Sequence, residues 1–296
     1  MRRRSNWPHW KSAREPRPRM NLPSTVAQAL AQAQAAGLAR IDAQLLLLHA
    51  LGRKPHDRAW LIAHDTDVLP PTSLLAWDAA LARRRQGDPL AYITGHKAFY
   101  GLDLRVDARV LDPRADTETL VEWALEVLPA APQRVLDLGT GSGAVALALQ
   151  HERRLWEVHA LDHSPEALAV AQANAQRLGL PVQFAQGDWL HGAHGQFHAI
   201  VSNPPYVADG DPHMDALHHE PAIALSSGPE GLDAIRTIIA KAPQHLHPGG
   251  WLLLEHGYNQ AQAVCALLAQ TGFLQVESRR DLAGIARCSG GRLSPA

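Results

Sequence analysis

The chain has 296 residues, a formal net charge of −1 and an apolar content of 46%. Its near-neutral charge argues against a general polyanion binder, and no apolar run reaches the roughly 18 residues needed to span a membrane. The two cysteines, Cys265 and Cys288, give neither a disulfide framework nor a zinc pattern, which favours a location in the reducing cytoplasm.

Residues 1–19 form a basic segment with seven lysines and arginines against a single acid, Glu15. No apolar stretch follows the arginines, so the segment does not read as a secretory signal. We predict a disordered tail, with Met20 as an alternative natural start. This segment carries a charge of +6. Since the whole chain carries −1, the remaining residues carry −7.

Residues 20–88 are predicted to form a small helical domain. Ser24 or Thr25 can cap a first helix that ends at Gly37, a second apolar helix follows over 41–51, and a third begins after a proline pair. The apolar positions expected on the faces of the first and third helices are Val26, Leu30, Ala33, Leu74, Leu75 and Leu81. The domain carries no catalytic constellation. We interpret it as a docking domain for a macromolecular substrate, with a plain packing module as the alternative.

Residues 89–112 are predicted to connect this domain to the next one. Gly95 and Gly101 separate short runs of alternating apolar and polar residues over 92–111, as in a β-hairpin. The stretch 120–128 then reads as an apolar helix that opens a domain over 113–296.

From Arg134 onward, strand and helix patterns alternate. Strands are predicted near 134–138, 157–161, 182–186, 198–202, 251–255, 273–277 and 285–289. Helices are predicted near 144–151, 165–178, 230–246 and 259–271. This alternation indicates an α/β fold with a mainly parallel sheet covered on both faces.

The segment RVLDLGTGSGAVALAL, residues 134–149, reads as a buried strand, a glycine-rich turn and a helix. Its glycines have the spacing GxGxG and allow a ligand to approach the backbone closely. Dinucleotide sites prefer GxGxxG, and the lysine of a nucleotide-hydrolysing loop is missing. Asp137, at the end of the strand, is expected to be buried and to bond N–H groups of the loop or the ammonium of a ligand.

Carboxylates also follow the next two strands. Asp162 ends the second strand, 19 residues after Gly143, and can accept both ribose hydroxyls of an adenosine. After the third strand, Asp188 can accept a hydrogen from an adenine amino group, and Trp189 can stack on a flat ring. An acid after each of three successive strands is more specific than the glycines alone, and it points to an adenosine-containing cofactor.

The motif VSNPPYV, residues 201–207, ends the fourth predicted strand, because proline cannot donate to a sheet ladder. Asn203 offers a carbonyl acceptor and an amide donor, while Pro204 and Pro205 leave backbone carbonyls as acceptors with little freedom. Tyr206 adds an aromatic face with a polar tip. Together these groups could grip a planar group that carries an NH2, such as an amide or the edge of a base.

The chain resembles class I methyltransferases that use S-adenosylmethionine, and within them the HemK/PrmC family, from about Met20 to Arg292. The motifs that carry the resemblance are YITGHKAFYG, VLDPRADTE, VLDLGTGSGAVALAL, NPPYV, HHEPAIALSSGPEGL, GGWLLLEHG and DLAGIAR. It implies a Rossmann-like, seven-stranded, mainly parallel sheet with a helical N-terminal domain joined by a β-hairpin. It also implies methylation of the glutamine N5 in the GGQ motif of peptide chain release factors 1 and 2.

The resemblance assigns roles to particular residues. It implies cofactor contacts from Gly139, Thr140, Gly141, Ser142, Gly143, Asp162, Trp189 and Asn203, and a glutamine pocket over Asn203, Pro204, Pro205 and Tyr206. The chain departs from the family at Asp112, where an aliphatic residue is usual, and at Ala115, where proline is usual. These departures concern local loop geometry and not the reaction class.

We hypothesise that Asn203 Oδ1 and the Pro204 carbonyl accept the two amide hydrogens of the substrate, while Tyr206 packs on the amide plane. An amide nitrogen is a poor nucleophile because its lone pair is shared with its carbonyl. Catalysis by Asn203, Pro204 and Tyr206 would therefore rest mainly on orientation and preorganised polarity.

Three alternatives stay open. The NPPY motif also serves DNA adenine-N6 methylation, which would need a basic groove that the sequence does not show. The other two are methylation of a ribosomal-protein glutamine and a non-catalytic, cofactor-binding adaptor. We expect a monomer without direct nucleic-acid binding. We also expect no metal site, because the histidine groups around His191 and His213 arise easily among 17 histidines.

Overall fold

The computed structural model describes residues 24–295, so the predicted basic tail and the alternative start at Met20 lie outside the described residues. The chain forms two compact units that divide between Ala82 and Arg83. The predicted division into three parts, with limits at 88 and 112, is not tested by these two units and stays a prediction.

The first unit is helical, as predicted, and contains α1 (Val26–Ala35), α2 (Arg40–Ala50), α3 (Arg58–Ala63) and most of α4 (Pro71–Arg85). Thr25 caps α1, because its side chain accepts a hydrogen bond from the Gln28 amide at 3.3 Å. The prediction for Leu75 was wrong: it is 71% exposed. Leu81 is buried as predicted, and Trp77 and Ala80 complete the buried face of α4, where the indole is fully buried.

The second unit begins with a short helix and the predicted hairpin. Helix α5 (Leu90–Thr94) ends at Gly95, which has a left-handed φ of 75°. Strands β1 (His96–Phe99) and β2 (Leu102–Arg105) pair antiparallel. A 3-10 turn, η1 (Ala115–Thr117), then leads into α6 (Glu118–Val127).

A seven-stranded sheet with the order β5-β4-β3-β6-β7-β9-β8 forms the body of this unit. Its strands are β3 (Arg134–Leu138), β4 (Glu157–Asp162), β5 (Gln183–Gln186), β6 (Phe197–Ser202), β7 (Leu246–Glu255), β8 (Leu274–Arg280) and β9 (Ala286–Arg292). The first five strands in this order run parallel, and β9 pairs antiparallel with both β7 and β8. The predicted α/β fold with a mainly parallel sheet is therefore confirmed.

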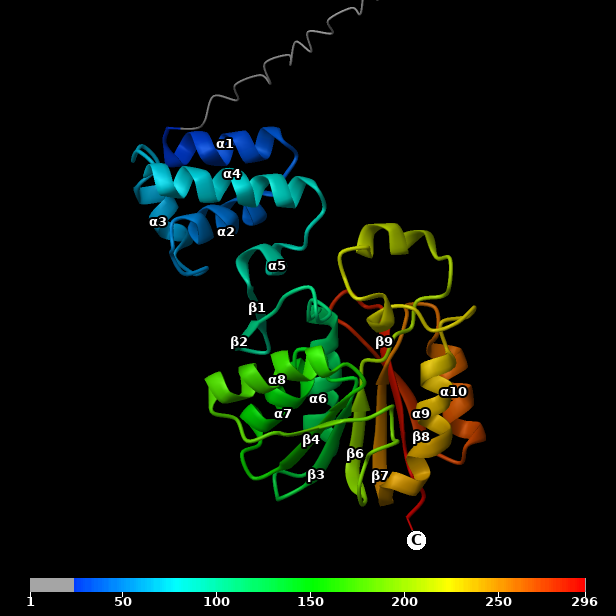
Figure 1. Ribbon diagram of the computed structural model, residues 1–296. Coiled ribbons are helices and arrows are strands. Elements are labelled where there is room, and N and C mark those ends of the chain that lie inside the picture. The colour runs from blue at the N-terminus through cyan, green and yellow to red at the C-terminus, as the bar shows by residue number, and fades with distance from the viewer. Residues whose placement is uncertain (1–23, 296) are drawn as a thin grey trace, which may run out of the picture. The chain divides into compact units, whose positions relative to one another are not determined.

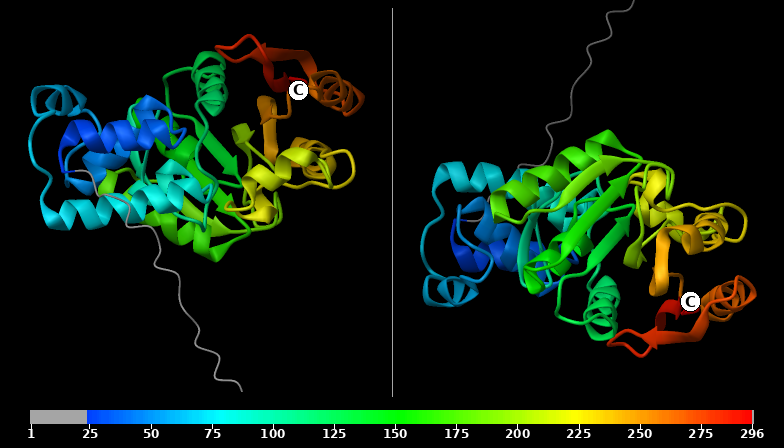
Figure 2. Two further views of the ribbon diagram at one scale, coloured as in Figure 1. Left: turned by 90° about the horizontal axis from the view of Figure 1, so that it is seen from above. Right: turned by 90° about the horizontal axis from the view of Figure 1, so that it is seen from below.

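Helices cover both faces of the sheet. Helices α7 (Ala144–Glu152) and α8 (Pro165–Leu178) lie on one side, with α6, and α9 (Asp233–Lys241) and α10 (Ala261–Gln270) lie on the other (Figures 1 and 2). Alternate strand residues serve the two layers: Val135 packs in the α6–α7–α8 core and Leu136 in the α9–α10 core. No helix within 24–295 is long and apolar enough to cross a bilayer.

Candidate active site

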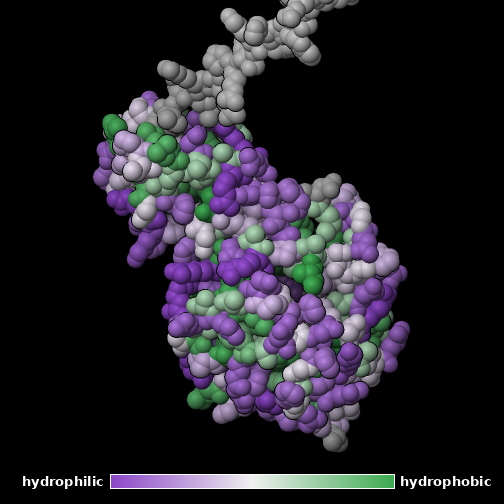
Figure 3. Space-filling model, in the orientation of Figure 1, coloured by the Kyte–Doolittle hydropathy of each residue, from purple (hydrophilic) through white to green (hydrophobic). Residues whose placement is uncertain are grey.

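A cavity of about 440 Å³ opens at the carboxyl ends of the parallel strands, within the size range of small-molecule sites. The loops after β3, β4, β5 and β6 all contribute to its wall. Strand order reverses around β3, which is where open α/β sheets bind their ligands. Figure 3 shows the hollow on this face of the larger unit, with apolar side chains beside it.

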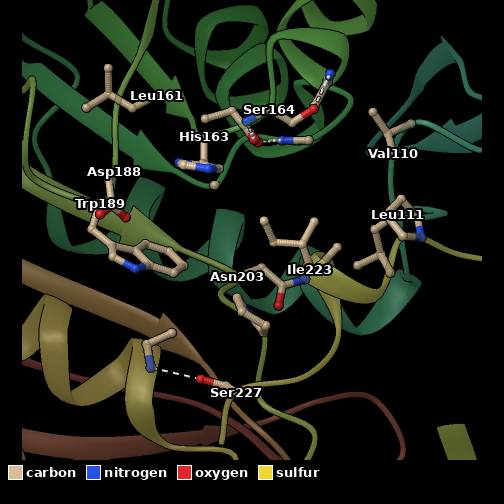
Figure 4. A pocket seen from close by; sticks show the side chains of 18 of the residues that line it. Val110, Leu111, Leu161, His163, Ser164, Asp188, Trp189, Asn203, Ile223 and Ser227 are labelled. Atoms are coloured by element: carbon tan, nitrogen blue, oxygen red, sulfur yellow. Dashed lines mark hydrogen bonds between the residues drawn. The ribbon is translucent and has the colours of Figure 1, made fainter.

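The structure brings about half of the predicted site residues to the cavity wall. The wall includes Gly139, Gly141, Asp162, Asp188, Trp189, Asn203 and Pro205. The other predicted residues, which lie outside the cavity wall, are Asp137, Thr140, Ser142, Gly143, Pro204 and Tyr206. Figure 4 shows Trp189 and Asn203 turned toward the same space.

The glycine loop needs glycine for its backbone conformation. Gly139, Gly141 and Gly143 have φ values of 69°, 55° and 85°, in the left-handed region that side chains disfavour. Asp162 holds this loop, because its Oδ2 accepts a hydrogen bond from the Gly141 amide at 2.8 Å. Its Oδ1 accepts one from the Ser164 amide at 2.9 Å. Each oxygen keeps a further lone pair for a ligand hydroxyl.

Asp137 is buried behind the glycine loop, with 1% of its surface exposed. Its Oδ2 accepts hydrogen bonds from the Thr140 hydroxyl at 2.7 Å and from the Ala146 amide at 3.3 Å. Burial raises the pKa of the Asp137 carboxyl to about 7, against the opposing effect of these two donors. The carboxyl therefore ties the loop to the first turn of α7.

This burial predicts a pH-dependent stability. The native state holds the Asp137 proton up to about pH 7, whereas the unfolded chain releases it near its ordinary pKa of 3.8. The stability that Asp137 contributes by keeping its proton in the native state is fully present below about pH 4. It is lost as the pH rises through about 7. It amounts to about 3 kcal/mol between pH 5 and pH 8. Urea unfolding at both pH values should show this loss in the wild type and a smaller loss in Asp137→Asn. Equal losses in the two proteins would contradict the assignment.

Trp189 adopts a φ of 51°, which is rare for a residue with a side chain. Its ring lies against the glycine loop, since a Cβ on Gly139 would stand 3.7 Å from the indole. The strained backbone therefore directs a flat aromatic face into the cavity, beside Asp188 (Figure 4).

The NPPY segment continues β6 at the cavity. Ser202 anchors it, because its buried hydroxyl donates to the Leu138 carbonyl at 2.7 Å. Asn203 Nδ2 donates to Thr117 Oγ1 at 3.3 Å. The Tyr206 hydroxyl donates to Glu255 Oε1 at 3.2 Å, and its pKa is raised mainly by burial. The packing of Tyr206 on a substrate amide is not tested by these contacts and stays a prediction.

Among the parts of the cavity wall that the sequence reasoning missed are the segments 109–111 and 221–227 and three residues of α9, Asp233, Ala234 and Thr237. Leu111 and Ile223 line the same cavity as Asn203 (Figure 4), and Ile223 is 62% exposed. Both residues are apolar and lie near a proline in an irregular stretch, where packing into the core is not expected. This was the sequence signal that could have pointed to a binding surface. These side chains give the rim an apolar character.

Asp112, one of the departures from the family pattern, is compensated locally. Its carboxylate lies 3.0 Å from Lys97 Nζ and 3.5 Å from the Arg114 guanidinium, so the charge is paired despite burial. The Asp112 amide also donates to Glu220 at 3.2 Å, and Arg114 bonds Glu220 as well. The loop geometry is thus maintained by charge pairs.

The part of the chain that the structure describes holds no group of three metal-ligating side chains, and the side chain of His213 lies outside it. The expectation that the protein needs no metal is not tested by this observation.

Comparisons with known proteins all indicate methyltransferases. Residues 24–95 match the PrmC N-terminal domain, and residues 116–277 match the Methyltransferase small domain. The release factor glutamine methyltransferase of Bordetella pertussis is 49% identical over 87% of this chain and 96% of that protein. The protein of the same name from Escherichia coli is 42% identical over 90% of this chain and 96% of its own length.

Among solved structures, a methyltransferase from Pyrococcus furiosus matches with a TM-score of 0.55 and 21% identity, covering 72% of this chain and all of that one. At this identity the match establishes the fold alone.

Proposed function

The chain belongs to the release factor glutamine methyltransferase family, and we propose that it methylates the side-chain N5 of the GGQ glutamine in peptide chain release factors 1 and 2. The observation that carries the proposal is that Asn203 shares one cavity with the glycine loop and Trp189. An acceptor for an amide NH2 and a site for an adenosine-containing cofactor thereby lie side by side.

We propose S-adenosylmethionine as the cofactor, and the residues present suit it. The glycine loop lets a ligand reach the backbone, Asp162 has lone pairs left for ribose hydroxyls, and Trp189 presents a face for adenine. Asp188 stands next to that face as an acceptor for an amino group. When bound, the cofactor supplies a methyl group on a positively charged sulfur.

Asn203 and Pro204 would hold the acceptor amide. Oδ1 of Asn203 and the Pro204 carbonyl take the two amide hydrogens, which directs the nitrogen lone pair toward the methyl group. Well-aimed geometry can supply about 7–11 kcal/mol, whereas one positioned base supplies about 3–5 kcal/mol. The surplus proton of the methylated nitrogen then leaves to water.

The partners follow from this proposal. We infer that the helical first unit docks the release factor, that the protein acts in the cytoplasm as a monomer, and that it needs no nucleic acid. The second unit would carry the chemistry by itself, since every residue of the cavity wall belongs to it.

Incubation with methyl-labelled S-adenosylmethionine tests the function. Purified release factors should be labelled on the GGQ glutamine, as mapped by mass spectrometry of the peptide. A release factor with glutamine replaced by alanine is the matched control and should stay unlabelled. Label on a ribosomal protein or on DNA, with none on either release factor, would contradict the proposal.

A further inference from the structure

Two buried side chains behind Asn203 have no part in the proposed chemistry. Thr117 is 3% exposed at the end of η1, and Glu255 is 1% exposed at the end of β7. Ser202 pairs with Leu254 across β6 and β7, so the next residues along are Asn203, which follows β6, and Glu255, the last residue of β7. The fold thus places a carboxyl group beside the NPPY segment.

A path of neighbouring polar groups joins Asn203, Thr117, Glu255 and Tyr206. Asn203 Nδ2 donates to Thr117 Oγ1 at 3.3 Å, and a hydroxyl that accepts in this way still has its own hydrogen to donate. That hydroxyl lies near Glu255 and lowers the pKa of its carboxyl. From the other side, the Tyr206 hydroxyl donates to Glu255 Oε1 at 3.2 Å. Glu255 therefore accepts from Tyr206 and has a second oxygen, Oε2, without a hydrogen-bond partner within 24–295.

The position of Glu255 is costly for stability. Burial raises the pKa of the Glu255 carboxyl to about 7, and its Oε2 has no well-formed hydrogen bond to any residue within 24–295. Arg287 is the nearby cation, but it lies 3.1 Å from both Asp116 and Asp281, which share its charge. An unfavourable buried acid next to a candidate substrate-binding segment is typical of a functional role.

The path has a consequence for the orientation of the Asn203 amide. The two ends of a carboxamide have the same shape and opposite hydrogen-bonding character. Thr117 can accept from Nδ2 only while its own hydrogen points elsewhere, and the nearby Glu255 carboxyl, whose Oε2 has no other partner within 24–295, offers an acceptor for that hydrogen. A reversed amide would present NH2 to the NH2 of the substrate.

We propose that Thr117 and Glu255 are positioning residues that fix the Asn203 amide with Oδ1 toward the acceptor nitrogen. This proposal rests on the proposed function, because it assumes that Asn203 receives an amide. It adds two residues, one from the turn before α6 and one from β7, that act through Asn203 and Tyr206 without touching the substrate.

Thr117→Val tests the proposal with little change of shape. Loss of one hydrogen bond to Asn203 should lower kcat about tenfold. The KM for cofactor and the melting temperature should stay near those of the wild type. Thr117→Ser keeps the hydroxyl and should retain most of the activity. Glu255→Met, which replaces a buried acid by an apolar chain of similar length, is a second variant and should also lower kcat without weakening cofactor binding.

The Asn203→Ala background separates positioning from a general structural role. If Thr117 acts through Asn203, Thr117→Val should add little to the loss already caused by Asn203→Ala in single-turnover assays. If the rate loss in the double variant equals the product of the losses in the two single variants, the proposal is overturned. Wild-type kcat in Thr117→Val, with Asn203→Ala inactive, would also overturn it and leave the proposed function standing. Full activity of Asn203→Ala would instead defeat the proposed site itself.

Discussion

Replacing Asn203 with alanine should lower the rate of release factor methylation by about 10²–10³-fold, the loss typical of removing one preorganised polar group from a reaction centre. The side chain lies in the cavity wall, and its Nδ2 is occupied by Thr117, so its carbonyl oxygen is the group left for the substrate. Because the glycine loop and Asp162 are untouched, the cofactor Kd should change by no more than a few-fold. Single-turnover rates and a cofactor titration on the same preparation measure both quantities.

Asn259→Ala is a suitable control, because Asn259 is exposed and lies outside the cavity wall. It should methylate at the wild-type rate. Near-normal turnover by Asn203→Ala would contradict the account of catalysis, even if cofactor binding were also normal.

Asp162→Ala should have the opposite signature, a cofactor Kd raised by about 10–100-fold, as expected for the loss of one or two hydrogen bonds to a charged group. Asp162 supports the loop through the Gly141 amide and stands in the wall where ribose hydroxyls are expected. Once cofactor is saturating, kcat should recover to within a few-fold of the wild type, since Asn203 is unchanged. Isothermal titration and steady-state kinetics separate the two effects.

Glu157→Ala provides the matched control at the other end of the same strand, where Glu157 is exposed and bonds His159. It should leave the cofactor Kd unchanged. An Asp162→Ala protein that binds cofactor as tightly as the wild type would remove this residue from the site.

The sequence was sufficient for the order of strands and helices in the second unit, because buried parallel strands and amphipathic helices leave strong local patterns. The glycine turn, Asp162 and Trp189 could be found for the same reason, since each follows directly after a predicted strand. The cavity brings them together at one edge of the sheet.

Other features depend on contacts that no local pattern shows. Thr117 and Glu255 are 138 residues apart in sequence, and only the fold places both beside the NPPY segment, where they bond Asn203 and Tyr206. Leu111 and Ile223 are likewise brought to the cavity by irregular loops. The error at Leu75 has a similar origin, because Trp77 takes the buried position on α4.

A crystal structure with S-adenosylhomocysteine and a peptide containing the GGQ sequence would test the central claim most directly. We predict that Asn203 Oδ1 lies about 3 Å from the glutamine side-chain nitrogen. That nitrogen should also lie on the line along which the cofactor sulfur would carry its methyl group. A complex in which the glutamine side chain binds away from Asn203, or in which Nδ2 faces the substrate, would contradict the account.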